Sequence, residues 1–373
     1  MRAAFRVDAS RAIGTGHVMR CLALADAIRA DGGECTFVMR RLDGHLIDFV
    51  AGRGHHVEPL PAPDAARRAA ATDSHLAWLE ADPATDATQS AAAIAAAGGA
   101  DWLVVDHYAL DATWEHAVRA AVDRVAVIDD LADRPHDADL LIDQNLSDDA
   151  GRYDGLTAAG CTRLLGPRYA LLRPEFAARR AAGTRDPRAP VRRVLVFLGG
   201  VDAPGATLPA LAALESVRDG ELAADVVIGA TNPRADAIAD WCRTRAWVRL
   251  HPGSADLAAL MDGCDLAIGA GGTTVWERCA LALPSVIVTI ASNQLAGASA
   301  VARRGAALYA GPATPPEACE TNLAVMLSAL IGSEDLRSHV AESAAALVDG
   351  RGVARVLARL QESLPALRRA EPA

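Results

Sequence analysis

The sequence contains no lysine, and all 37 of its Lys+Arg residues are arginines. Reactions that need a lysine of the enzyme itself are therefore excluded. These are Schiff-base chemistry with pyridoxal phosphate, phosphate binding by a Walker A loop, and protein-kinase phosphoryl transfer. An acyl enzyme built on a Ser-x-x-Lys motif is excluded for the same reason.

Aromatic residues are also scarce, at 4% of the 373 residues, whereas hydrophobic residues make up 51%. Alanine, leucine and valine must therefore fill the cores of a chain long enough to bury them well. At about 100–200 residues per domain, this length predicts two domains.

Cysteines are few and scattered: there are seven, with no C-x-x-C pair among them. This pattern favours reduced thiols in the cytoplasm over a disulfide framework or a zinc site. No apolar signal segment precedes the strand-like run at 3–7, and no run of about 18 apolar residues occurs, so we expect a cytoplasmic protein without a membrane span. The net charge of -10 argues against nucleic acid or an anionic membrane as a partner.

Short β-branched runs alternate with longer helical patterns along the whole chain. Most of the runs are continuously apolar, as expected of strands buried on both faces of parallel sheets. We therefore predict an α/β, doubly wound architecture. The expected strands cover residues 3–7, 35–39, 102–106, 124–128, 139–142, 193–198, 224–228, 247–250, 265–268 and 285–290.

The periodicity is weakest at residues 178–190, where arginine, glycine and proline dominate before a new strand-like run begins at Arg193. Such a shift marks a domain boundary. We predict an N-terminal domain of residues 1–182 and a C-terminal domain of residues 191–373.

Three further segments are assigned from their composition and position. Residues 60–74 and 84–100 are rich in Ala, Pro, Asp and Thr, and we expect loops and a surface helix of the first domain there. A last helix over about 352–364 could pack on either domain.

A glycine turn, Gly14-Thr15-Gly16-His17, joins the first predicted strand to a predicted helix. In this geometry backbone N–H groups point at an anion, and Gly14 and Gly16 allow close approach or positive φ. His17 falls in the first helical turn, where the helix dipole disfavours imidazolium and leaves the neutral imidazole that a general base requires. The alternative is a capping turn with a solvated histidine. Asp8 either orients a neighbour or merely ends its strand.

Polar residues also follow other predicted strands. Asp106, His107 and Tyr108 end the strand that starts at Trp102, at the sheet edge where open α/β folds bind ligands. His107 and Tyr108 could hydrogen-bond a polar substrate there, whereas Asp106 could simply cap the next turn. Residues 129–130 and 143–145 end two further strands in the same way.

The second half carries a Gly-rich segment, Gly269–Glu277, between a strand and a helix. Backbone N–H groups at Gly271 and Gly272 and the hydroxyl of Thr273 suit a diphosphate that is bound without metal or lysine. Glu277, one turn later, can accept both hydroxyls of a ribose. The alternative is that Thr273 and Glu277 only cap the helix start.

Two more segments of this half suit a nucleotide sugar. Gly199-Gly200 ends the strand 193–198, and the amides of Asn293 and Gln294 suit sugar hydroxyls. Together the turns describe two facing domains whose loops point into one cleft for a nucleotide diphosphate. The segment 137–139 has the spacing of metal ligands but favours a solvated turn, so we predict no metal and no cofactor.

Residues 5–10 and 13–22 resemble the N-terminal motif of the PseG family, the UDP-2,4-diacetamido-2,4,6-trideoxy-β-L-altropyranose hydrolases of pseudaminic acid biosynthesis. The resemblance covers nearly the whole chain. It continues at residues 105–108, 128–132, 143–145, 169–174, 198–202, 271–277 and 293–294.

The resemblance implies a GT-B-like fold, related to MurG-type glycosyltransferases, and hydrolysis of the anomeric C–O bond to give UDP and the free sugar. It also implies that the N-terminal domain, 1–182, carries the sugar site and the catalytic base and that the C-terminal domain, 191–373, binds the UDP. By position it implies water activation by His17, sugar contacts by Tyr108 and Asn293, diphosphate contacts by Gly271, Gly272 and Thr273, and ribose contacts by Glu277. In the family Gly199-Gly200 is commonly followed by serine, whereas this chain has Val201, which puts the identity of the sugar in question.

Two other functions fit the same residues. A GT-B glycosyltransferase would use a UDP-sugar donor and the same base on an acceptor hydroxyl. A nucleotide-sugar binding or regulatory protein without turnover is the second alternative, although His17 beside Tyr108 argues against it.

Overall fold

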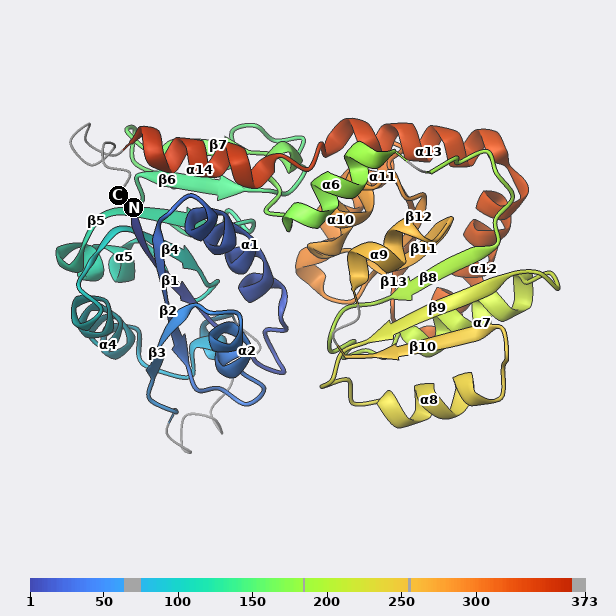
Figure 1. Ribbon diagram of the computed structural model, residues 1–373, viewed down its shortest axis with the longest axis horizontal. Helices are drawn as coiled ribbons and strands as arrows, with labels where there is room; N and C mark the ends of the chain where they lie inside the picture. Colours follow the sequence, from blue (N-terminus) through green and yellow to red (C-terminus); the bar gives the residue numbers. More distant parts are fainter. Residues whose placement is uncertain (64–74, 184, 254–255, 364–373) are drawn as a thin grey trace. The chain divides into compact units, whose positions relative to one another are not determined.

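The computed structural model describes residues 1–63, 75–183, 185–253 and 256–363 (Figure 1). Most of the loop expected at 60–74 therefore lies outside the described residues. The chain divides into two compact units. Unit 1 contains residues 1–145 and 149–173 and the C-terminal helix α14 (Gly352–Glu362), and unit 2 contains residues 146–148 and 174–351.

Unit 1 is built on a seven-stranded parallel sheet with the order β3-β2-β1-β4-β5-β6-β7. Its strands are β1 (Arg2–Val7), β2 (Glu34–Arg40), β3 (His56–Leu60), β4 (Ala100–Asp106), β5 (Val122–Ile128), β6 (Leu140–Asp143) and β7 (Thr162–Leu165). Its other helices include α1 (Gly16–Ala30), α2 (Ile47–Gly52), α4 (Pro83–Ala96) and α5 (Ala112–Val118).

Successive residues of the central strands enter different cores. Phe5 of β1 and Trp102 of β4 pack in the core with α1 and α14, whereas Ala4 and Leu103 pack in the core with α4 and α5. This alternation explains why the strands are continuously apolar, because both faces of the sheet are covered.

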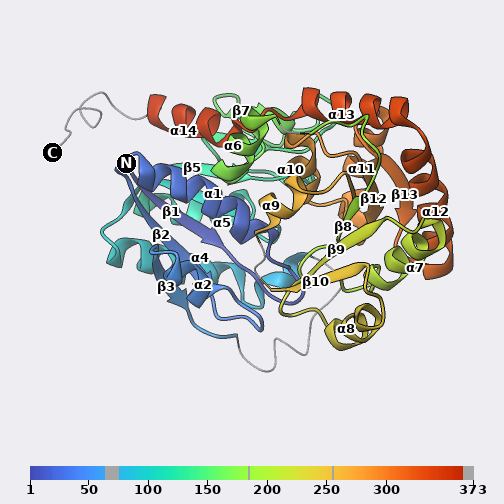
Figure 2. The ribbon, with the colours of Figure 1, turned by 45° about the vertical axis from the view of Figure 1, so that its right-hand side comes forward.

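Helix α14 completes unit 1 although it lies at the other end of the chain. It runs beside α1 (Figures 1 and 2), and its Val356 and Leu360 are fully buried. The indole N–H of Trp102 donates to the carbonyl of Leu360 at 3.1 Å.

Unit 2 is built on a six-stranded parallel sheet with the order β10-β9-β8-β11-β12-β13. Its strands are β8 (Arg193–Phe197), β9 (Ala223–Ile228), β10 (Val248–Pro252), β11 (Leu266–Ala270), β12 (Ser285–Thr289) and β13 (Leu308–Pro312). Its helices are α6 (Pro174–Ala182), α7 (Thr207–Val217), α8 (Ala235–Arg243), α9 (Leu257–Asp262), α10 (Thr274–Ala280), α11 (Leu295–Arg303), α12 (Pro316–Gly332) and α13 (Glu334–Leu347).

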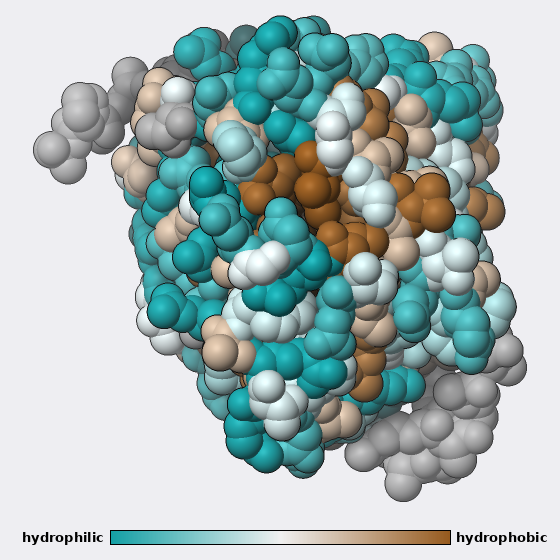
Figure 3. Space-filling model, turned by 90° about the vertical axis from the view of Figure 1, so that its right-hand side faces the viewer, coloured by the Kyte–Doolittle hydropathy of each residue, from teal (hydrophilic) through white to brown (hydrophobic). Residues whose placement is uncertain are grey.

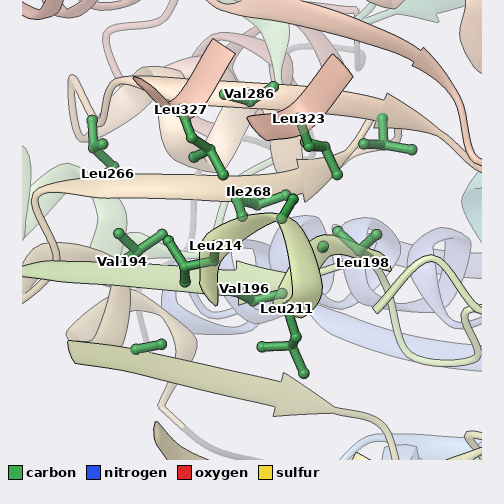
Figure 4. Packing of buried hydrophobic residues seen from close by; sticks show 14 of the residues in the cluster. Val194, Val196, Leu198, Leu211, Leu214, Leu266, Ile268, Val286, Leu323 and Leu327 are labelled. Atoms are coloured by element: carbon green, nitrogen blue, oxygen red, sulfur yellow. The ribbon is translucent and has the colours of Figure 1, made fainter. Parts of the chain in front are cut away.

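The main core of unit 2 lies between its sheet and helices α7 and α12. Leu211 and Leu214 of α7 and Leu323 of α12 pack on Val196 and Ile268 of the central strands (Figure 4). These side chains are aliphatic, as the scarcity of aromatic residues predicts.

Strand order reverses between β1 and β4 in unit 1 and between β8 and β11 in unit 2. The predicted doubly wound α/β architecture is thus confirmed. At a reversal point, the loops after the two adjacent strands run in opposite directions. Open α/β sheets bind their ligands in the crevice between these loops.

The predicted boundary at residues 182–191 differs from the observed units in two places. Helix α6, assigned to the first domain, belongs to unit 2, where the guanidinium of Arg180 donates to the carbonyls of Ala280 and Ala345. Helix α14, included in the second predicted domain, belongs to unit 1 because its apolar face is buried on α1.

Hydrophobic residues gather in the middle of one face of the molecule, bordered by hydrophilic ones (Figure 3). Among the described residues, the exposed large hydrophobic side chains are those of Phe49, Leu76, Leu295 and Val325. No helix in the described part of the chain is both long and apolar enough to cross a membrane.

Candidate functional site

His17 lies at the point where the sheet of unit 1 reverses its strand order. The turn after β1 is closed by a hydrogen bond from Gly14 N–H to the Ser10 carbonyl at 2.8 Å, and Gly14 has a φ of 79°, which glycine adopts without strain. Helix α1 then begins at Gly16, so His17 lies in its first turn as predicted. Asp106 ends the neighbouring strand β4, where it pairs with Val7 of β1.

A buried carboxylate fixes the imidazole of His17. Its Nδ1 lies 2.7 Å from Oδ1 of Asp106, which is fully buried, and His17 itself is 8% exposed. Arg20, one turn along α1, donates to the same carboxylate through Nε at 2.7 Å and Nη2 at 2.6 Å. Asp106 is thus an orienting residue rather than a turn cap.

Burial alone would raise the pKa of Asp106, but Arg20 and His17 outweigh it and hold the pKa well below its usual range. The carboxylate is therefore ionised and can only accept hydrogen bonds. In neutral His17, Nδ1 then carries the proton and Nε2 carries the lone pair. This arrangement prepares His17 to accept a proton at Nε2.

Tyr108 extends this network on the other side. Its hydroxyl donates to Oδ1 of Asp130 at 2.5 Å, and Arg20 reaches Oδ2 of the same residue at 3.0 Å. Burial and the charge of Asp130 raise the pKa of Tyr108 well above its ordinary value, so the phenol stays protonated. The ring of Tyr108 lies edge-on to His17, with 4.7 Å between centroids.

A short 3-10 helix, η1 (His75–Leu79), adds two rings to this group. Trp78 stacks on Tyr108 with centroids 5.5 Å apart and stands edge-on to His17 at 6.4 Å. His75 contacts both Trp78 and Tyr108, at 4.7 and 5.0 Å. We call Trp78, His75 and Tyr108 the aromatic wall.

Asp8 was one possible orienting residue, but it does not contact His17. Its Oδ1 accepts the backbone N–H of Arg40 at 2.6 Å, and its Oδ2 lies 2.7 Å from Nη1 of Arg6. Arg6 and Arg40 also converge on Asp86 of α4, at 2.8 and 2.6 Å. These four residues form a buried charge cluster that links β1 and the end of β2 to α4.

His107 is likewise internal: it is 3% exposed, and its Nδ1 accepts the N–H of Ala109 at 3.1 Å. Burial and the nearby Arg6 keep its pKa well below the ordinary value, so it stays neutral. The expectation that His107 could contact a substrate is therefore not supported, whereas Tyr108 stands next to His17.

The predicted polar strand ends at 129–130 and 143–145 also converge. The hydroxyl of Tyr153 lies 3.0 Å from a carboxylate oxygen of Asp129 and 3.2 Å from one of Asp143. Burial raises the pKa of Asp143 to about 7, against 3.8 for the ordinary group. This carboxyl group therefore titrates near neutrality.

In unit 2 the glycine turns come together at the reversal point of the second sheet. A Cβ on Gly271 would lie 3.3 Å from side-chain carbons of both Gln294 and Thr289, and one on Gly199 would lie 3.6 Å from Ile290. Gln294 accepts the N–H of Ile290 through Oε1 at 3.0 Å. The turns after β8, β11 and β12 thus share one region.

The turn after β9 joins them, because a Cβ on Gly229 would lie only 2.1 Å from the carbonyl oxygen of Gly200. Asp202 has a structural role: its carboxylate accepts the N–H groups of Ala206 and Thr207 at the start of α7. The Gly200 backbone therefore packs closely on Gly229, and Asp202 caps the helix that follows.

Arg278 supports the Gly-rich segment from inside. It is 1% exposed and donates to the Ala270 carbonyl at 2.9 Å and to the Thr274 hydroxyl at 3.1 Å. A Cβ on Gly269 would lie 2.2 Å from its Nη1, so any larger residue there would displace the Arg278 guanidinium. Burial lowers the pKa of Arg278 to about 10, although the neighbouring Cys279 and Glu277 act in the opposite direction.

The remaining predicted residues of unit 2 lie in the same region. Thr273 precedes α10 without a side-chain capping bond, and Glu277 is half-buried in the first turn of that helix. Asn293 is exposed in the 3-10 helix η4 (Ser292–Gln294) after β12. Capping alone therefore does not account for Thr273. Gly16 at the start of α1 and Gly272 before α10 have no side chain, so their backbone groups can be approached closely.

Among the residues described, no group of three or more His, Cys, Asp or Glu side chains is placed to hold a metal ion. The sequence interpretation missed Arg20, the buried charge cluster and Trp78. Arg20 could have been found, since it lies three residues after His17 and therefore on the same helix face.

No protein-family model matches the chain. SpsG of Bacillus subtilis, a spore coat polysaccharide biosynthesis protein, is 32% identical over 207 residues, which cover 54% of this chain and 59% of SpsG. A UDP-2,4-diacetamido-2,4,6-trideoxy-β-L-altropyranose hydrolase of Campylobacter jejuni is 22% identical over 305 residues, or 82% of this chain and 97% of that enzyme.

Solved glycosyltransferases share the fold. MurG of Acinetobacter baumannii matches with a TM-score of 0.62 at 16% identity, covering 97% of this chain and 99% of MurG. The spinosyn rhamnosyltransferase SpnG matches with a TM-score of 0.61 at 17% identity, covering 95% and 99%. The chain therefore has the GT-B fold, and this prediction is confirmed.

Proposed function

We propose that this protein is a nucleotide-sugar hydrolase that cleaves the anomeric C–O bond of a UDP-sugar to give UDP and the free sugar. One observation carries the proposal: His17 is held at Nδ1 by the ionised Asp106, so that its Nε2 is the basic atom. A protein that only binds a nucleotide sugar has no use for such a base.

In this mechanism His17 accepts a proton from water at Nε2 as the water oxygen attacks the anomeric carbon. The C–O bond to the diphosphate breaks, and its electron pair leaves with UDP. Asp106 stabilises the imidazolium that forms, while Arg20 keeps the carboxylate ionised and in place. UDP is a good leaving group, so one base and well-placed hydrogen-bond donors suffice.

The residues predicted from the sequence make up the proposed site. For the sugar we propose Gly14, Gly16, Tyr108, Asn293 and Gln294, and for the nucleotide Gly199, Gly200, Gly271, Gly272, Thr273 and Glu277. The clustering of the glycine turns supports the nucleotide assignment, because close backbone approach is what a diphosphate needs.

For the substrate we propose a UDP-2,4-diacetamido-2,4,6-trideoxy sugar, in a route of the pseudaminic acid type. The motifs of residues 5–22 and the 22% identity to the Campylobacter jejuni hydrolase over 97% of its length support it. The seven cysteines are free thiols, six of them buried, which supports a reducing compartment such as the cytoplasm.

The test is UDP release from a panel of UDP-sugars in water, without acceptor, with and without EDTA. We expect the wild type to release UDP from the 2,4-diacetamido sugar in both conditions. His17→Ala should still bind UDP but lose about 10²–10⁴-fold in turnover. Equal release by both proteins would contradict the role of His17.

A GT-B glycosyltransferase is the second candidate, because SpsG, at 32% identity, is named for polysaccharide biosynthesis. His17 would then deprotonate an acceptor hydroxyl in place of water. Release of UDP only after an acceptor is added would identify this reaction. A protein that binds UDP-sugars but releases no UDP with any acceptor would be a binding protein.

A further inference from the structure

The aromatic wall gives unit 1 an apolar surface directly beside His17. Trp78 stacks on Tyr108, and His75 closes the group against both rings. Tyr108 is 6% exposed, whereas Trp78 and His75 are only partly buried. Part of this aromatic surface is therefore accessible at the edge where the basic atom lies.

The polar groups next to the wall already bond to one another. The Tyr108 hydroxyl donates a hydrogen bond to Asp130, and the Asp106 carboxylate accepts hydrogen bonds from Arg20 and His17. A sugar hydroxyl in contact with the aromatic wall would lose bound water and would gain no hydrogen bond from these paired groups, which costs free energy. C–H and methyl groups would lose nothing and would gain apolar contact.

The wall is also uncharged. Burial lowers the pKa of His75, and with Arg134 and His17 it outweighs the opposing charges of Asp133 and Asp130. At neutral pH His75 is therefore a neutral ring, and the surface that it shares with Trp78 does not favour a charged or strongly hydrated group.

We propose that Trp78, supported by His75 and Tyr108, is a specificity-determining residue that packs on the apolar side of the sugar and selects a methyl group at C6 over a hydroxymethyl group. This inference rests on the proposed nucleotide-sugar function. It does not depend on whether water or an acceptor receives the sugar.

The experiment measures binding rather than turnover, using His17→Ala protein so that the ligand stays intact. The probes are UDP-N-acetylglucosamine, its 6-deoxy analogue and UDP alone, each titrated by calorimetry. We expect the 6-deoxy sugar to bind about tenfold more tightly than the 6-hydroxy sugar, in the range that small apolar differences give.

Adding Trp78→Ala should bring the ratio of the two affinities close to one and leave the affinity for UDP unchanged. Trp78→Phe retains a flat apolar ring and should restore most of the preference. Trp241→Ala is the matched control: Trp241 forms an aromatic pair with Trp247 beside the start of β10, at the amino end of that strand, so the ratio should not change.

Three outcomes would overturn the inference: equal binding of the two sugars when Trp78 is present, equal weakening of both by Trp78→Ala, or no binding of either sugar. A preference that depends on Trp78, in a protein whose wild type releases no UDP from any sugar, would instead support the wall and refute the hydrolase.

Discussion

The two units share one topology and use it differently. In both, the sheet is parallel and reverses its strand order at the centre, and the loops that carry the candidate site residues leave from that point. Unit 1 places charged and aromatic side chains there, with His17, Asp106 and Arg20 in direct contact. Unit 2 places glycines there, and backbone atoms lie where side chains would otherwise be.

In the proposed function, this difference assigns the chemistry to unit 1 and the nucleotide binding to unit 2. A base needs a fixed tautomer and an ionised partner, which buried ion pairs provide. A diphosphate needs N–H groups at close range, which glycine turns provide. Changes in unit 1 should therefore alter the reaction and its pH dependence, whereas changes in unit 2 should alter nucleotide affinity.

The largest expected effect is that of Asp106→Asn. The amide can present its N–H₂ group to Nδ1 of His17, which favours the wrong tautomer, and it leaves the buried Arg20 without its main counter-charge. We expect turnover to fall about 10²–10⁴-fold while UDP affinity stays within about twofold.

The matched change is Asp130→Asn, which removes the other carboxylate that Arg20 contacts but leaves the pair of His17 and Asp106 intact. Its turnover should fall much less. Steady-state kinetics and UDP titration check both variants, and an equal loss in the two would show that His17 is not oriented by Asp106.

The next effect concerns stability and should be confined to unit 1. Leu360 of α14 is fully buried in the core with α1, so Leu360→Ala should lower the free energy of unfolding by about 2–5 kcal/mol. Urea unfolding measures the loss, with the exposed neighbour change Arg359→Ala as control. Proteolysis should cut unit 1 first, and earlier cleavage of unit 2 would contradict the assignment of α14.

Gly229→Ala should affect unit 2 in turn. The new Cβ would collide with the carbonyl oxygen of Gly200 at 2.1 Å, so the glycine turns must shift. At about 1–3 kcal/mol for such overpacking, we expect UDP affinity to fall about 10–100-fold. Gly297→Ala on α11 is the control, since its Cβ would meet no atom within 4 Å. Equal affinities in the two variants would refute nucleotide binding at these turns.

The last expected effect is gradual, because it is a change in how stability depends on pH. Burial raises the pKa of Asp143 from 3.8 to about 7, so between these values the folded protein holds a proton that the unfolded chain has released. The free energy of unfolding from this group is therefore highest below about pH 4 and falls by up to about 1.4 kcal/mol per pH unit up to pH 7.

Asp143→Asn should remove this slope, and urea unfolding at a series of pH values would show the difference from wild type. Asp148→Asn is the control, because Asp148 is exposed and its pKa is lowered by Arg303 and Arg304 rather than raised. An unchanged slope in Asp143→Asn would show that other groups cause it.

The sequence predicted the central strands well and the edge strands poorly. β3, β7 and β13 were missed, and all three lie at the edges of their sheets. β3 contains Glu58 and Pro59, and β13 ends at Gly311-Pro312, so neither has the continuous apolar run that marks a strand buried on both faces.

The candidate site was predictable where glycine and strand-end patterns are local, as for His17 and the Gly271 turn. It was not predictable where contacts span the chain. His17 and Asp106 are 89 residues apart, and Arg6 and Asp86 are 80 apart. Such pairs depend on which strands become neighbours, and that information is not contained in either segment alone.

The position of α14 also determines when unit 1 can finish folding during translation. The indole of Trp102 donates to the carbonyl of Leu360, which lies 258 residues later in the chain. At ordinary translation rates, Leu360 is added on the order of 13–50 s after Trp102. Unit 2 can close during that interval, while the face of the first sheet that α14 will cover is still bare. Until α14 is made, the nascent chain therefore carries an exposed hydrophobic face to which chaperones can bind.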